Sequence, residues 1–116
     1  MPEIISQIPI GLNITAELRK LDQNFIPHYI LQSGNHHSGT ILLSLIQADC
    51  TVIIYGQQRN ELNKLIFRPV HKDVSLAPNI ADEYIQRAMK RDPDLWVIEI
   101  ETRDPNNFFE TYFKEF

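Results

Sequence analysis

The sequence predicts an α+β fold in which a mainly antiparallel sheet of about five strands is covered by three helices. Short apolar segments bounded by Gly, Pro or Asn are typical of strands. Longer segments with apolar residues three and four positions apart indicate helices. The expected order along the chain is α-β-β-β-β-α-β-α: a four-strand meander follows the first helix, and a helix, one more strand and a final helix complete the chain.

Length and composition limit the class of protein. The chain has 116 residues and is expected to form a single domain over 1–116, because it is too short for two independent cores. A net charge of −4 and the lack of a Lys/Arg cluster argue against nucleic acid as a partner. No apolar run is long enough for a membrane span, and the N-terminus lacks the basic start of a signal peptide. We therefore expect a cytoplasmic protein that binds neither membrane nor nucleic acid.

The first helix is expected to begin at Asn13, because asparagine caps helix N-termini well. Its apolar residues then share one face: Ile14, Leu18 and Leu21. The first strand is expected over Phe25 to Gln32. Pro27 lacks an amide donor, which suits an edge strand or the start of a strand.

Three more strands are expected over Thr40 to Gln47, Thr51 to Gly56 and Lys64 to Arg68. Their connections are short enough for antiparallel hairpins, so a meander is the natural pairing. Ile41 to Ile46 and Val52 to Tyr55 are apolar at successive positions, which indicates strands covered on both faces. These two strands are therefore predicted to be central in the sheet.

The second helix is expected from the cap Asn79 through Arg91, with acidic residues in its first turn and basic residues in its last. The strand Leu95 to Thr102 follows and alternates apolar and polar residues. Asp104 and Pro105 then supply an N-cap followed by proline at the first helical position, which predicts a final helix.

The final helix would carry large aromatic side chains on one face: Phe109, Tyr112, Phe113 and Phe116. Burial of each stabilises by about 2–3 kcal/mol, so we expect them to pack on their own sheet or on another protein. Three short helices leave too little cover for a sheet whose central strands are apolar on both faces. This deficit predicts a homodimer or a dedicated protein partner, with the four aromatic residues in the interface.

A possible catalytic site lies in the string from Asp92 to Thr102, where Asp94 precedes a strand bearing Glu99 and Glu101. The string resembles part of the metal-dependent nuclease signature, in which an acid precedes a strand with Glu-x-Lys. Glu101 stands where that family has lysine, and the two central strands lack the carboxylates that would hold the ion. The preferred interpretation is that Glu99 and Glu101 form the hydrated face of an edge strand.

The loop from Ser33 to Gly39 contains His36 and His37 between two glycines. No further residue stands at the paired spacing that a metal site needs, so a solvated hairpin loop is preferred, and no metal or cofactor is expected. The single cysteine, Cys50, fits a reducing compartment. It is expected to be a structural, small apolar residue rather than a nucleophile, because the neighbouring Asp49 disfavours its thiolate.

The favoured function is a non-enzymatic protein-interaction module, namely a small acidic accessory, chaperone-like or immunity-type protein that forms a dimer. The element order is similar to that of small bacterial secretion-chaperone domains, with one strand placed differently. One alternative is a degenerate metal-dependent nuclease or small hydrolase using Glu99, Glu101, Asp94 and the histidines. A second alternative is a small-ligand-sensing domain with a pocket near Trp96 and Tyr84.

Overall fold

The computed structural model describes residues 8–72 and 75–114. Within that part of the chain it has two α-helices, five strands and a short 3₁₀ turn. In order these are α1 (Ile10–Gln23), β1 (His28–Gln32), β2 (Ile41–Ile46), β3 (Val52–Arg59), β4 (Leu65–Pro69), α2 (Pro78–Arg91), β5 (Trp96–Glu101) and η2 (Phe108–Glu110). The predicted α+β class and the five-stranded sheet are therefore confirmed.

The strands form one sheet in the order β1-β5-β2-β3-β4. β5 lies between β1 and β2, antiparallel to β1 and parallel to β2, while β2, β3 and β4 pair as antiparallel hairpins. The predicted four-strand meander is wrong at its first step, and one of the pairings is parallel. The cause is that β5, the last strand in sequence, has one wholly apolar face, whose Trp96, Ile98 and Ile100 join the core under α1, and it takes the interior position between β1 and β2.

The prediction that two strands are covered on both faces is confirmed. Every residue of β2 from Ile41 to Leu45 is buried, and so is β3 from Val52 to Tyr55. β5 is also buried along most of its length, with Glu99 half-buried and Glu101 exposed at its end. Because β5 is an interior strand, the expectation that Glu99 and Glu101 mark an edge strand is wrong.

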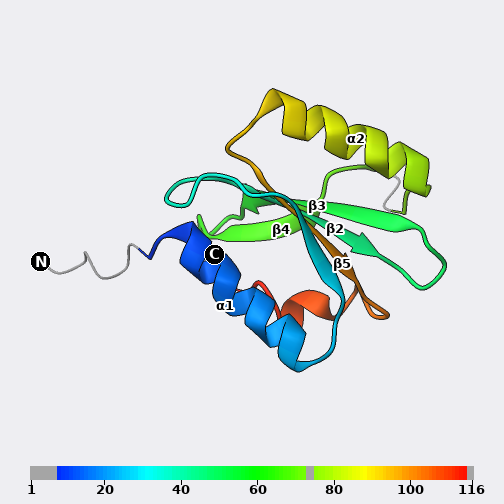
Figure 1. Ribbon diagram of the computed structural model, residues 1–116, viewed down its shortest axis with the longest axis horizontal. Helices are drawn as coiled ribbons and strands as arrows, with labels where there is room; N and C mark the ends of the chain where they lie inside the picture. Colours follow the sequence, from blue (N-terminus) through cyan, green and yellow to red (C-terminus); the bar gives the residue numbers. More distant parts are fainter. Residues whose placement is uncertain (1–7, 73–74, 115–116) are drawn as a thin grey trace, which may run out of the picture.

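Each face of the sheet is covered by a different part of the chain (Figure 1). α2 lies on one face, where its Ala81, Ile85 and Ala88 form a core with residues of β2, β3 and β5. α1 and the C-terminal segment lie on the other face and contribute to a second core, which includes Ile14, Leu21, Phe108 and Phe113. The predicted deficit of cover is therefore wrong, because the C-terminal segment supplies apolar area that three short helices were not expected to supply.

The predicted third helix is also wrong. Asp104 is the predicted cap of this helix, and its carboxylate accepts hydrogen bonds from the backbone and side-chain amides of Asn107 at 3.3 and 2.7 Å, but no helix begins there and Asn107 precedes η2. Only the short turn η2 follows, and Phe113 adopts a left-handed backbone with φ 53°. Isolated helices this short are marginal in water. Burial of Phe108 and Phe113 in the core therefore determines the path of the segment.

The two α-helices begin slightly earlier than expected. α1 begins at Ile10 after Pro9, and α2 begins at Pro78 after Ala77, so neither Asn13 nor Asn79 is the cap. Pro78 occupies the first helical position, where the missing N–H costs nothing. The residues just before both helices supply no side-chain cap, so tertiary packing holds these ends.

Candidate functional site

Large apolar side chains are exposed where the chain leaves α1 and enters β1. The side chain of Phe25 is 91% exposed, that of Tyr29 is 66% exposed and that of Ile30 is 37% exposed. These three residues and the outer backbone of β1 form what we call the β1 edge surface. Tyr29 and Ile30 project to opposite faces of the sheet, so these apolar side chains line both sides of the same edge.

Phe25 is held outward by the way α1 ends. The Ile26 N–H donates to the Leu21 carbonyl at 2.9 Å, and the Phe25 N–H donates to the Asp22 carbonyl at 3.1 Å. This pair of bonds is the Schellman motif, which requires a left-handed residue and usually employs glycine. Phe25 takes that position with φ 56°. The motif turns Ile26 into the core and leaves the Phe25 ring in water.

The backbone of β1 has a defined inner and outer side. The Glu101 N–H donates to the Pro27 carbonyl at 3.0 Å, which makes these facing residues a hydrogen-bonded pair. Bonded and non-bonded pairs alternate along an antiparallel ladder. Tyr29 therefore bonds to β5, whereas His28 and Ile30 direct their N–H and C=O groups away from the sheet. β1 is the edge strand that Pro27 predicted.

The other edge strand, β4, is protected. Its ladder phase is set by the Val70 N–H, which donates to the Ile54 carbonyl at 2.9 Å, so Leu65 and Pro69 face outward. Pro69 offers no donor, and Arg68 adds charge beside it.

β1 lacks proline and permanent charge, and its His28 Nε2 lies 3.4 Å from the Asp22 carboxylate. No charged residue or proline lies between His28 and Gln32. Its one irregularity is a bulge after Ile30, which limits the regular part of the strand to three residues, His28 to Ile30. β1 therefore offers a short, uncharged edge to another strand.

Charge varies along β1 on the side covered by α2. At the His28 end, burial raises the pKa of Glu99 above its usual value, and the neighbouring charges of Glu101 and Asp82 raise it further. At the Gln32 end, Gln32 shares a shallow depression with Arg87 and Lys90 of α2. On this side of the sheet, carboxylates of β5 lie near the His28 end of β1, and basic side chains of α2 lie near the Gln32 end.

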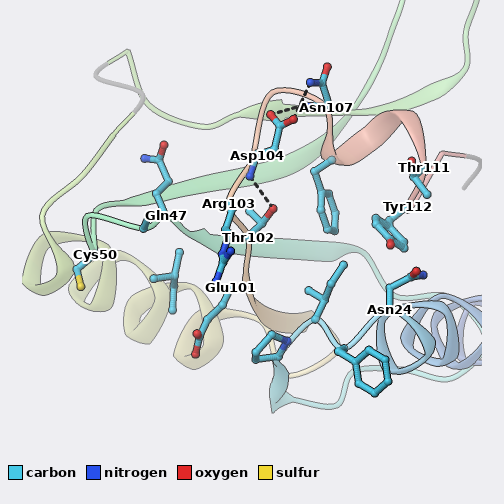
Figure 2. Close-up of a pocket in the computed structure, with 16 residues that line it drawn as sticks. Asn24, Gln47, Cys50, Glu101, Thr102, Arg103, Asp104, Asn107, Thr111 and Tyr112 are labelled. Carbon is cyan, nitrogen blue, oxygen red and sulfur yellow. Dashed lines mark hydrogen bonds between the residues drawn. The ribbon is translucent and has the colours of Figure 1, made fainter.

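A groove of about 1020 Å³ lies next to Phe25, where the parallel strands β2 and β5 end (Figure 2). Figure 2 shows Cys50 and Gln47 at one end of this β2–β5 groove and Asn24 and Tyr112 at the other. The polar residues that follow β5 also line it: Thr102, Arg103 and Asp104. The carboxyl ends of neighbouring parallel strands are a frequent location of ligand sites in α/β sheets.

The aromatic residues predicted to form an interface are only partly placed. Phe113 is 2% exposed and belongs to the core, and Phe109 and Tyr112 are half-buried against that core. The Phe109 ring stacks on Phe67 with centroids 5.3 Å apart. Phe116 lies outside the described residues. An interface through this set stays a prediction, and the more exposed apolar residues are those of the β1 edge surface.

The residues of the nuclease alternative do not meet in one site. Glu99 and Glu101 face α2, whereas the backbone of Asp94 lies near the glycines of the loop after β1. Across residues 8–72 and 75–114, no three His, Cys, Asp or Glu side chains are close enough to hold a metal ion.

The loop with His36 and His37 is not a hairpin, because it joins β1 to β2 and these strands are separated by β5. It is exposed, as expected, and it is tied down at two points: the Gly11 N–H donates to the His36 carbonyl at 2.9 Å, and the Trp96 indole N–H donates to the Asn35 carbonyl at 2.8 Å. The loop thus holds α1 against the end of the sheet.

Two further expectations are corrected. Trp96 belongs to the core under α1, whereas Tyr84 packs against the core under α2, so these two residues do not line a shared pocket. Cys50, expected as a structural apolar residue, is exposed in the β2–β3 turn, where it occupies a left-handed position with φ 71°. Neither helix of the described residues is long and apolar enough to cross a membrane.

Sequence reasoning missed Phe25, Tyr29 and Ile30. The available signal was Pro27, which indicated an edge strand, together with the aromatic residue two positions before it. The exposure of Phe25 depends on the Schellman motif, which sequence alone did not indicate because glycine is absent from that position.

Solved structures with the same fold include two of a DUF1491 family protein from Caulobacter crescentus CB15. The crystal structure has a TM-score of 0.72 at 21% identity, covering 82% of this chain and 88% of that one. The NMR structure has a TM-score of 0.70 at 21% identity, covering 84% and 88%. The solution structure of protein Atu0922 from A. tumefaciens has a TM-score of 0.63 at 18% identity, covering 83% and 86%.

At these identities the likeness establishes the fold alone. No curated protein matches the sequence. The model of one family, described as "Protein of unknown function (DUF1491)", matches residues 9–110. That match spans most of the 116 residues, and the chain therefore belongs to the DUF1491 family.

Proposed function

We propose that the protein is a non-enzymatic interaction module that binds another protein chain along β1. The observation that carries this proposal is the contrast between its two edges: β4 has proline and charge at its edge, whereas β1 has neither. An edge strand without proline or permanent charge can add a strand through main-chain hydrogen bonds, with nearby side chains giving specificity.

Phe25 supports the same proposal. A side chain in the left-handed region costs about 1–2 kcal/mol relative to glycine, and a ring that is 91% exposed regains almost none of that through burial. Non-glycine residues in the left-handed region are enriched at functional sites, and Phe25 differs from Phe113, which has the same backbone but a buried ring. A partner strand on β1 would cover Phe25 and Tyr29, so burial of the Phe25 ring in the complex would offset the cost of its backbone.

Site-specific photo-crosslinking in cells that express the chain tests this function. A photoreactive phenylalanine analogue replaces Tyr29 in one variant, Phe25 in a second, and Leu62 in a control. Leu62 is 77% exposed in the β3–β4 turn, away from the β1 edge surface. We expect a defined protein adduct from positions 29 and 25 and none from position 62.

The adduct is also expected to disappear when Ile30→Pro is added, because proline removes an outward N–H of β1 without touching its bonds to β5. Equal crosslinking at all three positions, or an adduct that persists with Ile30→Pro, would contradict the proposed function.

A second candidate function, binding of a small amphipathic ligand, is favoured by the β2–β5 groove. The groove combines aromatic side chains, Phe25 and Tyr112, with the guanidinium of Arg103. A ligand selective for the folded state raises its melting temperature, so thermal-shift screening tests this candidate. The same screen on Arg103→Gln is the control, and hits that shift both proteins equally would count against the groove.

A further inference from the structure

We propose that the partner of the β1 edge surface is a second copy of this chain, paired antiparallel with the first about a twofold axis at Tyr29. This inference rests on the proposed function and names the occupant of the same surface. Pairing of two copies in this way would join their sheets into one continuous sheet.

The register follows from the direction of the backbone groups. Only His28 and Ile30 direct N–H and C=O groups outward in the regular part of β1. In an antiparallel pair, two residues that both point toward the partner strand must face each other. A twofold axis at Tyr29 puts His28 of each copy opposite Ile30 of the other, so every outward donor and acceptor of both residues is satisfied.

The side chains suit this register. The two Tyr29 residues would form a non-hydrogen-bonded pair, in which Cα atoms approach to about 4.5 Å and side chains make their closest contact. Both rings would lie on the face covered by α2, where each is now 66% exposed. β1 itself has no charged residue, so no like charges oppose each other in the ladder.

Charge around the strand also favours a second copy in this orientation. A twofold axis brings the β5 carboxylates of one copy toward the basic side chains of α2 in the other. Glu101 faces Pro27 at the His28 end, and Lys90 lies by Gln32 at the other end. Glu101 of one copy would therefore lie close to Lys90 of its partner, on the same face of the joined sheet.

The first experiment measures the mass of the purified full-length protein in solution by light scattering on a sizing column. We expect twice the chain mass of 13.5 kDa for the wild type and a single-chain mass for Ile30→Pro. The matched control is Leu65→Pro, which removes an outward N–H from the other edge strand and should leave the dimer intact. Unfolding curves of both variants show whether each still folds.

The second experiment exchanges charges. Glu101→Lys alone and Lys90→Glu alone place like charges together across the axis, and each should weaken the dimer about fivefold or more. The double variant restores an attractive pair and should recover most of the affinity. Recovery requires the two positions to meet between copies. A partner of different sequence, or two copies in parallel, would not give this result.

The outcomes separate this inference from the proposed function. A wild-type protein that stays monomeric at every concentration, while Tyr29 still crosslinks specifically to a different protein in cells, overturns the second copy and leaves the interaction module standing. A dimer that survives Ile30→Pro but dissociates with Leu65→Pro overturns both. A dimer whose double charge variant is weaker than either single variant overturns the antiparallel arrangement.

Discussion

Replacement of Phe25 by glycine should make the folded chain more stable, although it removes a large aromatic side chain. Phe25 lies at the left-handed position of the Schellman motif with φ 56°, where an L side chain costs about 1–2 kcal/mol. Glycine avoids this cost, but its greater conformational freedom stabilises the unfolded chain and so offsets about 0.4–1 kcal/mol of the gain. The ring is 91% exposed, so its loss from the monomer removes almost no burial.

The net gain is therefore about 1 kcal/mol in the free energy of unfolding. Unfolding entropy is about 2.1 cal/mol/K per residue, so for 116 residues this gain raises the melting temperature by about 4 °C. Urea unfolding and thermal melts of Phe25→Gly check both values. The comparison is made in the Ile30→Pro background, so that association does not contribute to the measured stability.

Phe25→Ala is the matched control, because it removes the ring but keeps a Cβ in the left-handed region. We expect its stability to stay within about 0.5 kcal/mol of the parent. A loss of more than about 1 kcal/mol in Phe25→Ala would mean that the ring packs on the monomer. A destabilised Phe25→Gly would refute the strain argument itself, because the backbone would then gain nothing from glycine.

Two other perturbations test the core and the charged face. Phe113→Ala should lower the free energy of unfolding by about 3–5 kcal/mol, because the ring is 2% exposed in the core under α1. Chemical denaturation measures this loss. A loss below about 0.5 kcal/mol, as expected for a surface residue, would show that the C-terminal segment does not cover the sheet. The pKa of Glu99 is raised by burial and then by Glu101 and Asp82, so the stability linked to this group is fully present below its ordinary value of 4.5 and is lost as the pH rises through the raised pKa. Glu99→Gln should therefore be more stable than the parent at pH 7 and equal to it below pH 4.5, and urea titrations at both pH values would contradict this if the difference were larger in acid.

Much of the fold could be predicted because burial leaves a direct pattern in the sequence. The continuous apolar runs of β2 and β3 identified central strands, and all five strands and both α-helices lie close to their expected ranges. The pairing of β1 could not be predicted in the same way. Sequence neighbours usually pair, but β5 has a more apolar surface than β1 and takes the place beside β2.

The path of the C-terminal segment and the candidate site could not be predicted, for a related reason. Helix periodicity placed Phe109, Tyr112 and Phe113 on one face, yet the left-handed backbone at Phe113 exists only because the aromatic side chains pack on the sheet. The exposure of Phe25 likewise depends on backbone geometry at the end of α1. Local pattern predicts which residues are apolar, whereas the tertiary fold determines which of them stay in water.

The interior place of β5 also affects when the molecule can fold. Trp96 to Glu101 comes late in the chain, yet it supplies the pairing partner of β1 and one neighbour of β2. During synthesis β1 leaves the ribosome before β5 does, so β1 of the nascent chain has no pairing strand until translation passes residue 101. Such late, non-local pairing slows folding and prolongs the exposure of apolar segments to chaperones and aggregation.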